Sequence, residues 1–142
     1  MPTEFEKNCE IIEESYEFTL SYAAQGHATD KGSAQGRQLR EHLTRAVEAM
    51  RSLNASCAAL LADGALQPSA PYEAFFEVLA RDARDSVAAV ELVLAQPGIS
   101  PQLIDNLNAS THLRALLTGL FLTAEIVESR QAQSSSEQHE LL

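Results

Sequence analysis

Apolar side chains recur at alternating steps of three and four residues along most of the chain, which is the spacing of one face of an α-helix. The longest uninterrupted pattern predicts a helix that spans residues 39–60 for three heptads. Its positions are Leu39, Leu43, Ala46, Met50, Leu53, Cys57 and Leu60. Similar patterns predict a first helix ending near residue 24, a third over residues 72–94 and a fourth that continues through Val127.

Residues that begin and end helices lie at the edges of these patterns. Thr3 and Glu6 form a capping box, and Ser100 followed by Pro101 is a typical helix start. Gly64 suits a left-handed helix end. The last two connections are short, so the second, third and fourth helices should be antiparallel neighbours. We therefore predict an all-α protein, an antiparallel up-down four-helix bundle.

Two segments lack any apolar period. The polar stretch 27–33, enclosed by glycines, predicts the most mobile internal loop. The polar stretch after residue 128 has no face that could enter a core. We therefore predict one bundle domain over residues 1–128 and a disordered C-terminal tail over residues 129–142.

Charge narrows the classes of partner. The 142 residues include 10 lysines and arginines against 20 acidic residues, a formal net charge of −10. Nucleic acids and anionic membranes both attract positive surfaces, so we expect neither as a partner. The first twenty residues are acidic, unlike a secretory or mitochondrial signal, and predict a cytoplasmic location. Arginine in preference to lysine, with abundant alanine, suits a bacterial protein.

Much of the negative charge follows one face of the first predicted helix. The residues of this acidic stripe are Glu6, Glu10, Glu13 and Glu17. Like charges at this spacing destabilise a helix by ~0.2–0.5 kcal/mol per pair, so a compensating contact is expected. One interpretation places Arg37, Arg40 and Arg51 of the second helix against the stripe. A second interpretation is that the stripe docks a basic partner. A third is a metal site, although the sequence lacks the Glu-x-x-His pairs that di-iron bundles use.

The fourth predicted helix carries a second apolar stripe opposite its core face. Its residues are Ala115, Gly119, Leu122 and Ile126. Two apolar stripes indicate a helix that is buried on both sides. The small residues would let another backbone approach closely. The stripe predicts a homodimer or partner interface, and the alternative is that this helix is central in an imperfect bundle.

One pair of residues invites comparison with an enzyme family. Arg37 and His42 form an Arg-x4-His sequence that resembles the motif of the helical nucleases of toxin–antitoxin systems. The resemblance implies a nuclease that uses these two side chains. Here the motif opens a helix, whereas in that family it closes a late helix beside a polar pocket. Phosphate-binding loops, cysteine pairs and Ser–His–acid arrangements are not recognisable in the sequence.

These observations predict a non-enzymatic, acidic helical interaction module, with no catalytic residue, metal or cofactor. Such a module would act as an adaptor, regulator, inhibitor or chaperone-like protein, and it would be a homodimer. Its partner would be another protein, and a basic surface on that protein would suit the acidic face. The first alternative is the nuclease built on Arg37 and His42. The second is a bundle that binds a small apolar ligand in its core near Tyr16, Met50 and Phe76.

Overall fold

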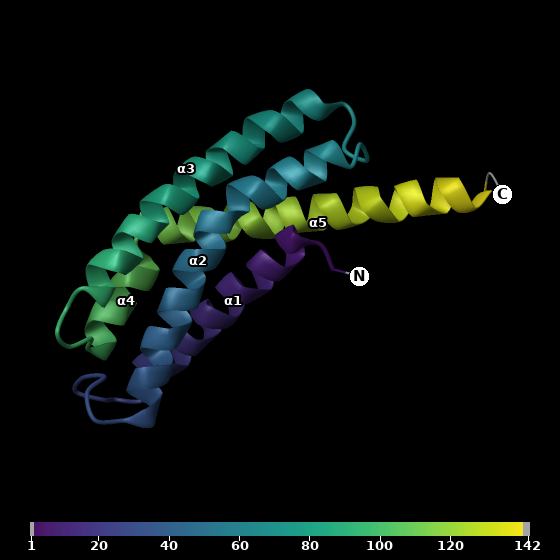
Figure 1. Ribbon diagram of the computed structural model, residues 1–142. Helices are drawn as coiled ribbons and strands as arrows, with labels where there is room; N and C mark the ends of the chain where they lie inside the picture. The colour runs from purple at the N-terminus through teal and green to yellow at the C-terminus, as the bar shows by residue number, and fades with distance from the viewer. Residues whose placement is uncertain (1, 141–142) are drawn as a thin grey trace.

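The computed structural model describes residues 2–140, with side chains as far as residue 133, and consists of helices joined by short connections (Figure 1). The helices are α1 (Glu4–Ala23), α2 (Ala34–Ala62), α3 (Ser69–Leu94), α4 (Pro101–Ala109) and α5 (Thr111–Glu140). The described residues include no strand, which confirms the all-helical prediction. None of the described helices combines the length and the apolar character that crossing a bilayer requires.

The predicted helix starts are confirmed by their hydrogen bonds. The side chain of Thr3 accepts a hydrogen bond from the Glu6 amide at 3.1 Å, and Ser100 accepts one from the Leu103 amide at 3.1 Å. Each bond satisfies an amide that has no partner inside its helix. The predicted helix end at Gly64 is confirmed as well, because its φ of 82° lies in the left-handed region that favours glycine.

The fourth predicted helix is wrong as a single element, because it is two helices that meet at Ser110. This residue has extended backbone angles, φ −62° and ψ 139°, and its side chain accepts a hydrogen bond from the Leu113 amide at 3.4 Å. The sequence contains the reason. The step from Leu107 to Leu113 is six residues, which does not return to the same face of one helix.

Beyond its predicted end at residue 128, α5 continues to Glu140. The predicted disorder of residues 129–142 stays a prediction, and Leu141 and Leu142 lie outside the described residues.

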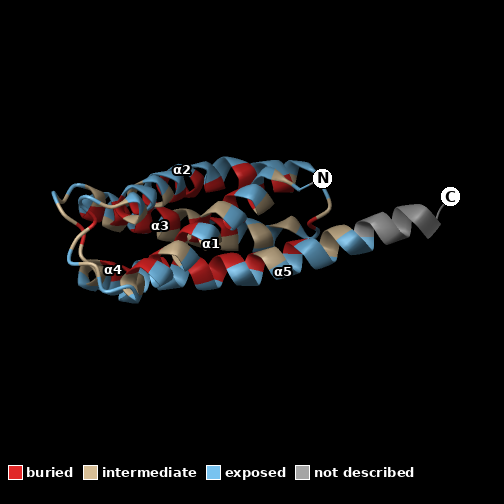
Figure 2. Cartoon of the chain, turned by 90° about the horizontal axis from the view of Figure 1, so that it is seen from below, coloured by how far each residue is buried: buried red, intermediate tan, exposed pale blue. Residues whose placement is uncertain are grey.

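The helices pack in sequence around one core. α1 packs on α2, α2 on α3 and α3 on α5, while α4 packs mainly on α1. The buried residues lie on the sides of the helices that face the interior of this arrangement (Figure 2). α1 and α5 make only a narrow contact, and the backbones of α2 and α5 do not approach each other closely. The specific up-down bundle of four helices is not confirmed, since the fourth side is built from the two helices α4 and α5.

The segment predicted to be the most mobile loop is fastened by a partly buried ion pair. Asp30 is only 6% exposed, and its Oδ2 accepts a hydrogen bond from Arg40 Nε at 2.5 Å. Its Oδ1 accepts another from the Ile99 amide at 2.6 Å. Arg40 also donates to the carbonyl oxygens of Leu94 at 3.1 Å and Gln96 at 2.9 Å. These contacts, which we call the Asp30–Arg40 clamp, join the loop to α2 and to the connection between α3 and α4.

The clamp brings two backbones unusually close. A Cβ atom at Gly36 in the first turn of α2 would lie 1.7 Å from the carbonyl oxygen of Asp30. Only glycine fits at this position without movement of one backbone.

We predict that Asp30→Asn lowers the free energy of unfolding at pH 7 by roughly 2–4 kcal/mol. This value lies between the cost of losing one charged hydrogen bond and the cost of breaking a buried ion pair. Burial opposes the charged form of Asp30, but the hydrogen bonds from Arg40 and Ile99 outweigh it and lower the pKa below 3.8. A lowered carboxyl pKa stabilises the fold above pH 3.8, and this contribution is lost as the pH falls through the lowered pKa.

Urea unfolding of the wild type and Asp30→Asn between pH 7 and pH 2 measures this contribution. The difference between the two proteins should shrink as the solution becomes acidic. Asp105→Asn, on the exposed surface of α4, is the control and should match the wild type. A difference that stays constant down to pH 2 would contradict the role of the clamp.

Candidate partner-binding grooves beside α5

Two grooves flank α5, one against α1 and one against α3. The first, which we call the acidic groove, has a volume of about 280 Å³. Its lining residues are Phe5, Glu6, Cys9, Glu10, Glu13, Ala124, Val127 and Glu128. The first turns of α1 lie beside the middle of α5 at this point (Figure 1).

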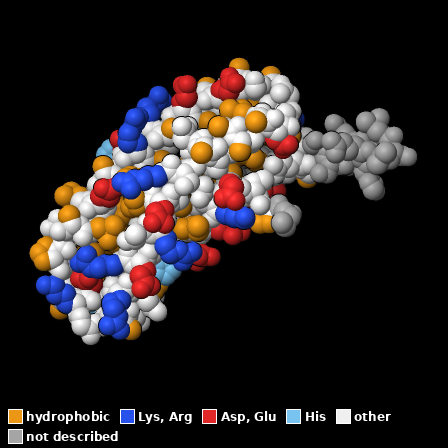
Figure 3. All heavy atoms as spheres, viewed as in Figure 1, with side chains coloured by type: hydrophobic (Ala, Val, Ile, Leu, Met, Phe, Trp, Pro, Cys, Tyr) orange, Lys and Arg blue, Asp and Glu red, His pale blue; other side chains and the backbone are white. Residues whose placement is uncertain are grey.

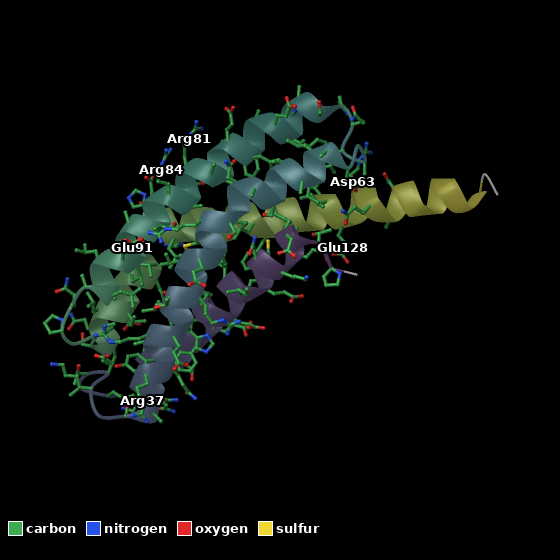
Figure 4. The ribbon with its side chains drawn as sticks, in the orientation of Figure 1. Arg37, Asp63, Arg81, Arg84, Glu91 and Glu128 are labelled. Atoms are coloured by element: carbon green, nitrogen blue, oxygen red, sulfur yellow. The ribbon has the colours of Figure 1, made fainter. Side chains whose placement is uncertain are left out.

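Helical spacing gives the acidic groove an apolar floor and acidic walls. Phe5 and Cys9 of α1 and Val127 of α5 are buried and form the floor. Neighbouring positions on α1 place the carboxylates of the acidic stripe along one wall, since residues three or four apart share a face. Glu128 projects from the side of α5 nearest to the start of α1 (Figure 4). Carboxylates therefore face each other across apolar side chains.

The structure places three of the four residues of the predicted acidic face in the acidic groove, while their role in partner binding stays a prediction. Glu6, Glu10 and Glu13 line the acidic groove, while Glu17 lies further along α1 and is exposed. Sequence reasoning did not include Glu128, because it could not show that α1 and α5 are neighbours.

The proposed pairing of α2 arginines with the acidic stripe is wrong. Arg40 binds Asp30, Arg51 pairs with Glu91, and Arg37 is exposed at the start of α2, far from Glu128 (Figure 4). Basic and acidic side chains are interspersed on the face seen in Figure 3. Among the described side chains, no lysine or arginine forms an ion pair with a member of the acidic stripe.

The acidic groove alters the protonation of two of its residues. Burial raises the pKa of Glu13, and the nearby charges of Glu17 and Glu10 raise it further. Burial, followed by the charge of Glu13, raises the pKa of the Cys9 thiol to about 12. Cys9 is therefore protonated at neutral pH and is a poor nucleophile and metal ligand. Among the described residues, no three His, Cys, Asp or Glu side chains are grouped closely enough to hold a metal ion.

Two exposed apolar side chains extend the same face. Phe121 is 50% exposed and lies on α5 two turns before Glu128. Leu20 is 47% exposed and lies on α1 two turns after Glu13. Sequence reasoning missed Phe121, although its spacing of three from Ala124 and seven from Glu128 places it on this face.

The second groove, which we call the apolar pocket, lies between α3 and α5 and has a volume of about 400 Å³. Its lining residues are Gln67, Pro68, Pro71, Tyr72, Phe75, Phe76, Leu122, Thr123, Ile126, Val127 and Arg130. Leu122 and Ile126 of the predicted interface line this pocket and are 51% and 41% exposed.

The other two residues of the predicted interface lie elsewhere. Ala115 is exposed outside the apolar pocket. Gly119 is buried against α3, where an added Cβ would lie 2.8 Å from Leu79 Cδ2. Its small size serves a close approach inside the chain, so the expectation that Gly119 admits another chain is wrong. The homodimer itself stays a prediction.

The other two sequence-based alternatives gain little from the geometry. His42 stacks on Phe18 with 4.4 Å between ring centroids, and neither His42 nor Arg37 lines either groove. The core around Tyr16 and Met50 holds a cavity of only about 20 Å³, which is room for about one water molecule. A small ligand therefore does not fit there. Phe76, the third residue of that hypothesis, lines the apolar pocket instead.

No family model, curated protein or solved structure matches this chain. Any function must therefore be argued from the two grooves themselves.

We predict that Glu13→Gln stabilises the protein by about 0.4–1 kcal/mol at pH 7 and low salt, because Glu13 has two like-charged neighbours at ~0.2–0.5 kcal/mol each. A raised carboxyl pKa means that wild-type stability is lost as the pH rises from 4.5 through the raised pKa. The advantage of glutamine should therefore vanish below pH 4.5. Thermal unfolding at several pH values measures it.

Glu41→Gln on α2 is the matched control. Arginines stand four residues before and after Glu41, so its loss removes attraction and brings no gain in stability. Equal effects of the two substitutions would show that the acidic stripe is not under electrostatic strain.

Proposed function

We propose that this protein is a non-enzymatic interaction module that binds a basic, amphipathic helix of another protein in the acidic groove. The observation that carries the proposal is a groove with several carboxylates on its α1 side and Glu128 on its α5 side, around an apolar floor, where no lysine or arginine pairs with them among the described side chains.

The shape of the groove favours a helix as the occupant. Proteins that bind amphipathic helices offer an apolar groove that takes residues spaced at i, i+3, i+4 and i+7. The narrow contact between α1 and α5 leaves such a groove, and Phe121 and Leu20 add exposed apolar surface along its length. A partner helix laid here would cover both side chains, which are now about half exposed.

Charge supplies the selectivity for a basic partner. Lysines or arginines on the two flanks of a docked helix would lie near Glu10 and Glu13 on one side and Glu128 on the other. Exposed ion pairs contribute only ~0–1 kcal/mol each, so the apolar contact must supply most of the affinity. The carboxylates would instead raise the association rate, reject acidic partners and make binding sensitive to salt.

The test is calorimetric titration with a synthetic amphipathic helix of about 18 residues, roughly five turns, with leucines on one face and lysines on both flanks. We predict that the double variant Glu10→Lys/Glu13→Lys binds about tenfold or more weakly, since each substitution replaces an attraction by a repulsion. The affinity of the wild type should fall with added salt. It should also fall as the pH drops toward 4.5, because Glu13, whose pKa is raised, gains a proton there.

The matched control is Glu41→Lys/Glu48→Lys, which changes the net charge equally on exposed positions of α2. Because neither Glu41 nor Glu48 lines the acidic groove, this variant should bind within about twofold of the wild type, the loss expected from overall charge alone. If both double variants bound the peptide equally weakly, net charge alone would explain the loss of affinity, and the proposal would be overturned. Phe121→Asp should also weaken binding, and an unchanged affinity there would exclude the groove.

A further inference from the structure

The apolar pocket is a separate feature from the acidic groove, because it lies on the other flank of α5. The two share only Val127, which is 1% exposed. Phe75 and Phe76 of α3 and Leu122 and Ile126 of α5 form its long walls, and the segment from Gln67 to Pro71 closes one side. Its volume of about 400 Å³ lies in the range of ~300–1,000 Å³ that is usual for small-molecule sites.

A single positive charge stands among the lining residues of this pocket. Arg130 Nη2 donates a hydrogen bond to the carbonyl oxygen of Gln67 at 2.6 Å, and Nη1 donates to Gln133 Oε1 at 3.4 Å. The bond to Gln67 holds the guanidinium against the segment that closes the pocket. A guanidinium has five N–H donors, so others remain for a ligand.

Arg130 also lacks a partner of opposite charge among the described side chains, where none of the ion pairs includes it. This is notable in a chain with 20 acidic and only 10 basic residues. An arginine at the edge of an apolar pocket presents a planar pair of donors that matches a carboxylate. The pocket thus has an apolar body and one anion-binding end.

We propose that the apolar pocket binds a free, single-chain amphiphile with an anionic head group, such as an acyl carboxylate. The chain lies against Phe75, Phe76 and Leu122, and the carboxylate pairs with Arg130. Head and tail of such a ligand match the one cation and the apolar walls. A second copy of the protein fits less well, since it would bring another net charge of −10 to the same surface.

The experiment is calorimetric titration of the full chain with three ligands that share a ten-carbon tail: decanoate, decanol and decyltrimethylammonium. We expect saturable binding of decanoate with a dissociation constant below about 1 mM. Decanol should bind at least about tenfold more weakly, as the loss of one charged hydrogen-bonded pair implies, and the cation more weakly still. Leu122→Asp should weaken decanoate binding as well, because it places a carboxylate beside the alkyl tail of the ligand.

Arg130→Gln should lower the affinity for decanoate to that for decanol, while Arg130→Lys should keep part of the preference. Arg114→Gln, an exposed arginine of α5 outside the pocket, changes the net charge equally and should leave decanoate binding unchanged. Far-ultraviolet circular dichroism checks that each variant is folded. Since Arg130→Lys keeps the charge, it also tests the head-group contact if the glutamine variant is unstable.

Three results would overturn the proposal. Decanoate and decanol could bind equally, or Arg114→Gln could weaken binding as much as Arg130→Gln. Sedimentation could instead show that the wild type is a dimer and that Leu122→Glu is a monomer. The pocket would then be the interface with a second copy of the protein. Binding of each ligand to the variant of the other site distinguishes this proposal from the preceding one. The basic peptide should bind normally to Arg130→Gln, and decanoate should bind normally to Glu10→Lys/Glu13→Lys.

Discussion

The contact between Asp30 and Arg40 fixes how the loop before α2, α2 itself and the connection between α3 and α4 meet, and the course of the following helices depends on that junction. Asp30 holds the backbone of Ile99 just before α4, and Arg40 holds carbonyl groups at the end of α3 and just after it. The start of α4 is thereby fixed beside the loop that precedes α2. The break at Ser110 then directs α5 along α3 and past α1. The position of α5 between these two helices leaves one groove on each of its flanks.

Two ion pairs contribute to the uneven distribution of charge. Arg40 is occupied by Asp30, and Arg51 is occupied by Glu91, so neither of these α2 arginines neutralises the acidic stripe of α1. The fold keeps the repulsion among Glu10, Glu13 and their neighbours, which is unfavourable for stability. Retained strain of this kind is common at surfaces that serve binding. On the other flank of α5 the surface is apolar with one cation, so the two grooves suit ligands of opposite charge.

Helical period and capping residues were enough to predict the three long helices before α4. The acidic stripe was also predictable, because helical spacing alone places its residues on one face. The break at Ser110 has a sign in the sequence, because the six-residue step from Leu107 to Leu113 does not fit one face of a single helix. The burial of Asp30 was not predictable, since its partners Arg40 and Ile99 lie 10 and 69 residues away. A polar loop residue gives no local sign of such contacts. Gly119 shows the same limit: a close approach was predicted, but its partner is α3 of the same chain.

The central claim is that the acidic groove is the docking site for a basic amphipathic helix. Amide chemical shifts of the isotopically labelled protein, followed during titration with that peptide, test it most directly. The account predicts the largest shifts at Phe5 to Leu20 in α1 and at Phe121 to Glu128 in α5, with little change over α2. Large shifts confined to α2, or no saturable shifts at all, would contradict it.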